Sequence, residues 1–134
     1  MASIFSRIVR GEIPCHKVAE SRTCLAFLDI NPVTRGHTLA IPKKEVDYLF
    51  DLDDTTYSDL LLFSKKVALA IGKVIPCARV GVAVVGLEVP HAHVHLIPIN
   101  AIADLSFTRG RASLTPQEME DTAALIRNAC EDIS

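Results

Sequence analysis

The chain has 134 residues, of which 49% are hydrophobic and 22% are charged, with a formal net charge of −2. This composition is typical of a globular protein with a buried core, and we expect a single domain over residues 1–134. The 14 basic residues are scattered and no apolar run reaches membrane-spanning length, which argues against nucleic acid or a membrane as a partner. The four cysteines show no C-x-x-C spacing and follow no secretory signal, which favours reduced thiols and a cytoplasmic location.

The first third of the chain predicts one short helix and three strands. Residues 3–10 carry apolar side chains at helical spacing, between a capping Ser3 and a terminating Gly11. Alternating or continuous apolar stretches then predict strands over 16–21, 24–30 and 36–42. We expect the strands to pair in an antiparallel sheet, because short polar turns connect the first two.

The middle and the end of the chain add a long helix, a strand and a final helix. Apolar residues recur at three- and four-residue steps over 53–74, with aspartates at the amino end and Pro76 beyond the carboxyl end. Residues 79–86 predict a fourth strand. Thr115-Pro116-Gln117-Glu118 combines an N-cap, a first-turn proline and a capping-box glutamate, which predicts a carboxyl-terminal helix.

Three histidines alternate with apolar residues in the stretch from Pro90 to Ile99. Alternation is the period of a β-strand, so His91, His93 and His95 are expected on one face and the residues between them in the core. The prolines at 90 and 98 lack a backbone donor and are expected to bracket this fifth strand.

A row of imidazoles suits nucleophilic catalysis better than a shared metal ion. The first and third Cα atoms of such a row lie roughly 13 Å apart, a span that ligands bonded to one metal at about 2.1 Å barely close. Two of the histidines could still share a metal, and a surface cluster without function is the remaining alternative. One imidazole acting as nucleophile, with its neighbours setting its tautomer and serving the leaving group, fits the spacing best.

The His-x-His-x-His stretch resembles the active-site signature of the histidine-triad (HIT) nucleotide hydrolases and transferases. Further matching segments occur in the family's order at residues 3–14, 25–32 and 36–44, so the resemblance covers about residues 3–99. It implies an α+β fold: a five-stranded antiparallel sheet with one long helix, plus short amino-terminal and carboxyl-terminal helices. It also implies a homodimer, in which two sheets join into one.

The resemblance assigns roles residue by residue. His93 corresponds to the nucleophile, His91 to the residue that orients it, and His95 to a group near the phosphate or leaving group. Asp29 corresponds to the ribose ligand, although an aspartate before Asn31-Pro32 is also a common turn residue. His37 corresponds to a residue beside the triad. The nucleobase pocket would be lined by Ile4, Phe5, Phe27 and Ile30, although the first two could equally pack only on the core.

Two departures from the family pattern affect the site. Leu87 and Glu88 stand where many members have a glutamine and a hydroxyl residue that touch the phosphate or leaving group. Glu88 would repel a phosphate unless protonated or paired, and it could instead face a basic leaving group, orient a histidine or point into solvent. Zinc-containing relatives carry Cys-x-x-Cys and a later histidine; the corresponding residues here are Ser3, Ser6 and Glu45, so we expect no structural zinc.

The sequence therefore predicts an enzyme that acts at the α-phosphate of a purine nucleotide through a nucleotidyl-histidine intermediate, without a cofactor. Candidate substrates are nucleoside phosphoramidates and dinucleoside polyphosphates, and the matching segments resemble the phosphoramidase branch more. The alternative is a nucleotide-binding or scaffolding module with little turnover. A metal hydrolase that uses two triad histidines is a weaker alternative, which stoichiometric zinc would favour.

Overall fold

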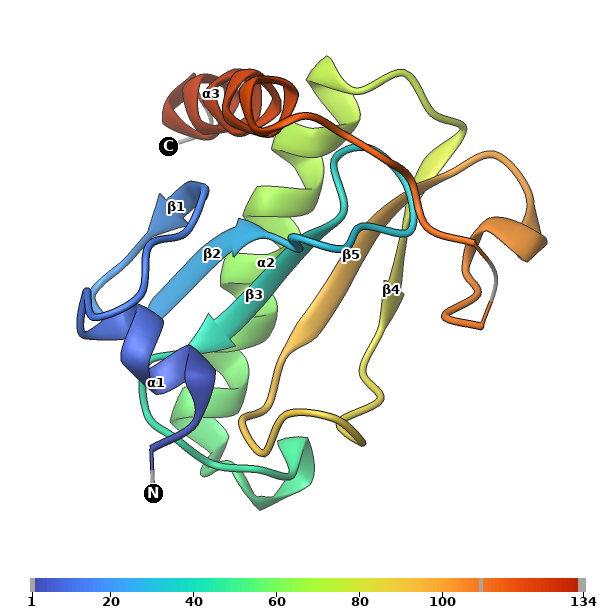
Figure 1. Cartoon of the computed structure of the whole chain (residues 1–134). Coiled ribbons are helices and arrows are strands. Elements are labelled where there is room, and N and C mark those ends of the chain that lie inside the picture. The colour runs from blue at the N-terminus through green and yellow to red at the C-terminus, as the bar shows by residue number, and fades with distance from the viewer. Residues whose placement is uncertain (1, 109, 133–134) are drawn as a thin grey trace.

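The computed structural model describes residues 2–108 and 110–132. Within these residues, five strands form one antiparallel sheet in the order β1-β2-β3-β5-β4 (Figure 1). The strands are β1 (Lys17–Glu20), β2 (Cys24–Leu28), β3 (Thr38–Pro42), β4 (Arg79–Ala83) and β5 (Val94–Ile99). Together with the helices, this sheet confirms the α+β fold that the sequence predicted.

The α-helices of the described residues are α1 (Ile4–Val9), α2 (Asp54–Val74) and α3 (Pro116–Asp132). Two short 3-10 helices, η1 (Leu49–Asp51) and η2 (Ile102–Asp104), lie in the connections. The predicted capping box begins α3: the Thr115 amide donates to the Glu118 carboxylate at 2.8 Å, and the Glu118 amide donates to the Thr115 hydroxyl at 3.1 Å. α3 has 17 residues and is longer than the short helix expected. None of the helices in the described residues is long and apolar enough to cross a membrane.

Different helices cover the two faces of the sheet. On one face α2 and α3 pack over a large core that includes Val94 and Leu96 of β5. On the other face α1 packs through Phe5 onto Phe27 of β2, in a smaller core. Side chains alternate along β5, so His95 lies on the α1 face, between two residues that point toward α2.

The fifth strand begins and ends later than predicted. It begins at Val94, opposite Ala40 of β3, so His91 and His93 precede it. Pro98 lies inside the strand, opposite Val80 of β4, and does not end it. The carbonyl of Pro98 accepts a bond from the Thr34 hydroxyl. The nitrogen and the carbonyl of one strand residue point to the same side, so the nitrogen of Pro98, which has no hydrogen to donate, also faces the β3 side, beyond the last residue pair of β3 and β5. The missing donor therefore costs no ladder hydrogen bond.

Candidate functional site

The three histidines converge on the α1 face of the sheet. His95 lies in β5 between Leu39 of β3 and Ala83 of β4, and it is therefore held from both sides by the ladder. The rings of His93 and His95 lie 4.9 Å apart, centroid to centroid. All three imidazoles are buried, including that of His91, which shows no exposed surface. The structure thus brings the triad together although only one of its members belongs to the strand.

The tautomer of His93 is set by a backbone carbonyl. Its Nδ1 lies 2.8 Å from the carbonyl oxygen of His91, and an oxygen of this kind can only accept a bond. Nδ1 therefore carries the proton, and Nε2 is left with a free lone pair. We expected His91 to orient His93. The group that accepts the bond from His93 is the main-chain carbonyl of His91 and not its imidazole.

The imidazole of His91 is directed toward the amino-terminal segment. Its Nε2 donates to the carbonyl of Pro42 at 2.7 Å, so its Nδ1 accepts, and the hydroxyl of Ser3 donates to it at 2.9 Å. Burial lowers the pKa of His91, which keeps this ring neutral. Glu45 completes the cluster by accepting bonds from the Ser6 hydroxyl and the Ser3 amide, both at 2.6 Å. These bonds, that of Ser6 first, lower the pKa of Glu45 to about 2.

His95 and His37 form a directional hydrogen-bond chain. The amide of Val33 donates to His37 Nδ1 at 3.0 Å, so the proton of the His37 ring lies on Nε2. That N–H donates to His95 Nδ1 at 2.9 Å, which leaves the His95 proton on Nε2. Burial lowers the pKa of His37 to about 3 and that of His95 to about 4. His37 thus contacts the triad, where we expected it beside the triad, and His95 presents a donor beside the free lone pair of His93.

Asp29 lies directly after β2, in a turn beside His37. One carboxylate oxygen accepts the Asn31 amide at 2.9 Å, as in a turn. The other lies 3.6 Å from Nε2 of His37. Burial raises the pKa of Asp29, and the negative charge of Glu88 acts in the same direction. Asp29 is therefore a turn residue that also borders the triad.

Of the four apolar residues expected around a nucleobase, two touch the triad or its neighbours. The ring of Phe5 lies edge-on to His93 at 5.1 Å and to Phe27 at 5.5 Å. Ile4 and Ile30 are exposed instead, at 48% and 81%. An exposed apolar side chain remains available to a base that binds from solvent, whereas the two phenylalanines are already buried.

Leu87 and Glu88 are exposed in the connection between β4 and β5. Glu88 makes no hydrogen bond or ion pair within the described residues. Its negative charge nevertheless raises the pKa of Asp29. Its carboxylate is therefore free to meet a ligand that enters from this side.

Sequence reasoning missed two residues at the triad, Phe107 and Arg111. The ring of Phe107 lies 4.6 Å from that of His95, and the guanidinium of Arg111 lies 5.7 Å from the centre of the Phe107 ring. Both residues belong to the connection between η2 and α3, which no hydrophobic period marks. The available signal was the pair of basic residues in the Arg109-Gly110-Arg111 sequence.

Two clusters bear on metal binding. Asp29, His37 and His95 bring ligand atoms within 4.8 Å of one another. However, the two imidazole nitrogens face each other at 2.9 Å across one proton, whereas two ligands of a tetrahedral zinc lie about 3.4 Å apart. In the other cluster, the hydroxyls of Ser3 and Ser6 replace the thiolates that zinc prefers and are used in hydrogen bonds. Neither donor set fits a zinc ion.

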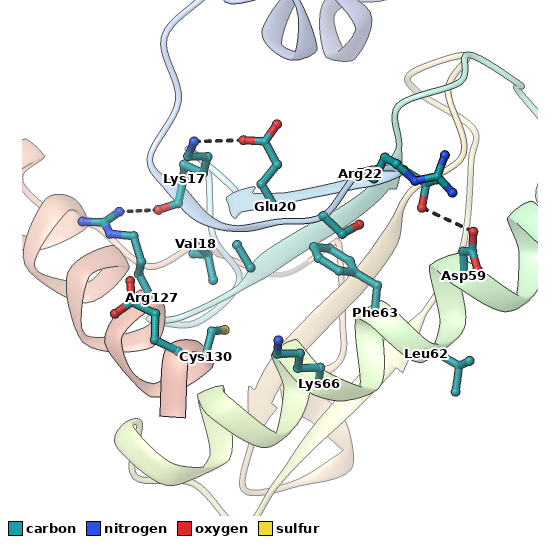
Figure 2. Close-up of a pocket in the computed structure, with 14 residues that line it drawn as sticks. Lys17, Val18, Glu20, Arg22, Asp59, Leu62, Phe63, Lys66, Arg127 and Cys130 are labelled. Carbon is teal, nitrogen blue, oxygen red and sulfur yellow. Dashed lines mark hydrogen bonds and ion pairs between the residues drawn. The ribbon is translucent and has the colours of Figure 1, made fainter. Parts of the chain in front are cut away.

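The largest hollow among those described lies away from the histidines. It has a volume of about 710 Å³ between β1, α2 and α3, on the sheet face opposite the triad. Figure 2 shows Lys66, Arg127 and Glu20 around it, together with Phe63 and Cys130. Its charged residues are of both signs, and Lys17 pairs with Glu20 at 3.0 Å.

The fold and the triad define a histidine-triad protein, and the family comparison agrees. The model of the HIT domain family matches residues 10–102, so the chain belongs to this family.

Individual relatives extend the comparison. The chain is 41% identical over 99 residues to adenosine 5'-monophosphoramidase hnt1 of Schizosaccharomyces pombe, which covers 73% of this chain and 74% of the relative. A zinc-bound histidine triad family protein from Mycobacterium smegmatis superposes with a TM-score of 0.85 at 29% identity, covering 98% and 95% of the two chains. A hypothetical histidine triad nucleotide-binding protein from Sulfolobus tokodaii gives 0.81 at 29% identity, covering 96% and 91%.

Proposed function

We propose that the protein hydrolyses nucleotides at the α-phosphate through a nucleotidyl-histidine intermediate, with a purine nucleoside phosphoramidate as the preferred class of substrate. The observation that carries this proposal is the pair of opposite tautomers at the triad. His93 is protonated at Nδ1 and has a free Nε2 lone pair, while His95 is protonated at Nε2. A nucleophile and a donor therefore stand side by side, with ring centroids 4.9 Å apart. The phosphoramidase name of a 41% identical relative supports the substrate class.

In the proposed reaction, His93 Nε2 attacks the α-phosphorus while the bond from phosphorus to the leaving nitrogen breaks. The carbonyl of His91 stabilises the positive charge that develops on the His93 ring, because it accepts a hydrogen bond from the Nδ1–H throughout the reaction. The leaving nitrogen accepts a hydrogen bond from the Nε2–H of His95 and takes its proton from solvent, because His95 Nδ1 is occupied by the His37 N–H. Water then attacks the nucleotidyl-imidazole and loses a proton to solvent, which releases the nucleoside monophosphate and restores His93.

The nucleotide would bind along the same face. Its ribose hydroxyls would donate to the carboxylate of Asp29, and its base would pack between the exposed Ile4 and Ile30, near Phe5 and Phe27. The reaction as proposed needs no cofactor. Glu88, exposed and unpaired among the described residues, would favour a leaving group with a positive charge.

The test is incubation of the purified protein with radiolabelled adenosine 5'-phosphoramidate, quenched early and analysed for AMP and for adenylylated protein. Wild type should release AMP and carry label on His93, and His93→Ala should lose both. His16→Ala is the matched control, because His16 pairs with Glu120 of α3 instead of the triad. AMP binding without product or adduct would favour the alternative, a nucleotide-binding module with little turnover.

We also propose that the protein forms a homodimer through β4. This strand lies at one edge of the sheet, and Val82 within it is 57% exposed. Beside it, exposed Leu61 and Leu69 of α2 help to line an apolar hollow of about 620 Å³. An unpaired edge strand beside apolar side chains is a favourable surface for strand pairing with a second copy.

A further inference from the structure

A closed circuit of contacts surrounds the third histidine. His95 bonds His37, which lies 3.6 Å from Asp29, and Asp29 in turn accepts the amide of Asn31. Arg111 continues the circuit, because its Nη1 donates to the carbonyl of Asn31 at 3.1 Å. The guanidinium stands over the Phe107 ring, which packs against His95 and closes the circuit. Arg111 is thus part of the rim of the triad.

The guanidinium is fixed in place by the loop that carries it. Its Nη2 donates to the carbonyl of Phe107 at 3.2 Å, so both of its bonds are to neutral main-chain oxygens. The amide of Ala112 donates to the carbonyl of Pro32 at 2.9 Å, which ties the loop to the turn after β2. An arginine has five N–H donors, and within residues 2–108 and 110–132 only two of those of Arg111 are used.

The charge of Arg111 has no partner at ion-pair distance among the described residues. Its charge acts on the site nevertheless. Burial and a neighbouring histidine lower the pKa of His37 and of His95, and Arg111 adds to both effects, while it opposes the effect of burial on the pKa of Asp29. The two lysines that follow β3 are paired with carboxylates away from the triad. Lys43 pairs with Glu20 at 2.8 Å and Lys44 with Asp53 at 3.7 Å.

We propose that Arg111 binds the phosphate of the nucleotide at the triad, with its unused N–H donors bonding the non-bridging oxygens. A guanidinium offers paired donors that match two phosphate oxygens, and its position next to Phe107 places them beside His95. The inference rests on the proposed function, because it assigns the group that neutralises the substrate's phosphate. It also explains how a site that has lost the family's polar pair at Leu87 and Glu88 can still hold an anion.

The experiment compares the affinities of AMP and adenosine, measured by calorimetry, for wild type, Arg111→Ala, Arg111→Lys and Arg22→Ala. Arg22→Ala is the matched control, because Arg22 borders the hollow on the opposite face of the sheet. For Arg111→Ala, AMP binding should weaken roughly 10- to 150-fold while adenosine binding stays within about twofold. Arg111→Lys should recover part of the loss, since it keeps the charge without the planar fork.

Two results would overturn the inference: an unchanged AMP affinity in Arg111→Ala, or an equal loss for AMP and adenosine. The second result would show that the arginine only holds its loop in place. A wild-type protein that binds AMP but hydrolyses no phosphoramidate would refute the proposed reaction alone, because the affinity comparison needs no turnover.

Discussion

Replacement of His37 by phenylalanine should destabilise the protein by breaking the hydrogen-bond chain at both ends. The ring is fully buried, so a phenylalanine of similar shape leaves the Val33 amide and the His95 Nδ1 atom without a partner. Each buried unpaired group costs about 1–3 kcal/mol, which gives a loss of about 2–6 kcal/mol at pH 7. His37→Gln should lose less, because its amide nitrogen can still donate to His95. His16→Phe serves as a control, since His16 is partly exposed and contacts Glu120.

The same variant tests the protonation state of His37. Its pKa falls from 6.5 to about 3 on folding, so below pH 6.5 the unfolded chain binds the extra proton. The stability that the neutral ring contributes is therefore complete above pH 6.5 and is lost as the pH falls toward 3. At pH 5 the wild type should have lost about 2 kcal/mol through this residue, a loss that the phenylalanine variant cannot show.

Urea unfolding of wild type and variants at pH 7 and pH 5 measures both effects. The difference between wild type and His37→Phe should shrink by about 2 kcal/mol at the lower pH. Nitrogen chemical shifts of His95 should show the Nε2-protonated tautomer in wild type and a mixture in the variant. A stability difference below about 0.5 kcal/mol at pH 7, or an unchanged tautomer, would contradict the chain deduced from the structure.

Three further predictions concern metal, assembly and the leaving group. Purified wild type should contain substoichiometric zinc by elemental analysis. The double variant Ser3→Cys, Ser6→Cys should contain more, because two thiolates would then join the His91 imidazole and the Glu45 carboxylate. Equal zinc in both proteins would refute the argument from ligand chemistry. Val82→Lys should convert a dimer to a monomer in light scattering, and an unchanged mass would exclude β4 as the interface. Glu88→Gln should speed cleavage of a dinucleoside polyphosphate several-fold relative to a phosphoramidate at low salt, because the substitution removes a negative charge near a negative leaving group. An equal change for both substrates would show that this carboxylate does not select the leaving group.

The strands and the faces of their side chains could be predicted from the sequence, because burial of one face places apolar residues at every second position of a strand. The burial of Val94 and Leu96 and the position of His95 on the opposite face followed directly from alternation in β5. The start of that strand could not be predicted in this way. An extended chain keeps the same period whether or not a neighbour pairs with it, so His91 and His93 fit the pattern although the ladder begins at Val94.

The parts of the site that were missed depend on the course of loops. Phe107 reaches His95, and Arg111 reaches Phe107, because their connection folds back onto the turn after β2. Nothing in the spacing of residues encodes such a return. The acceptor that orients His93 was hidden for a similar reason, because the direction of the His91 main-chain carbonyl is set by the backbone and not by residue type. The residues of the site could therefore be predicted where they lie in or next to a regular strand or helix.

The stretch matched by the family model, residues 10–102, contains all three histidines of the triad and ends before the loop that carries Phe107 and Arg111. Phe5, which contacts His93, lies on the other side of that stretch. In the proposed reaction, contacts to the nucleotide would come from this stretch, at Asp29 and Ile30, and also from the segments that flank it, at Ile4 and Arg111. Exchanging the segments that flank residues 10–102 with those of a relative should consequently change ligand affinity while the three histidines stay in place.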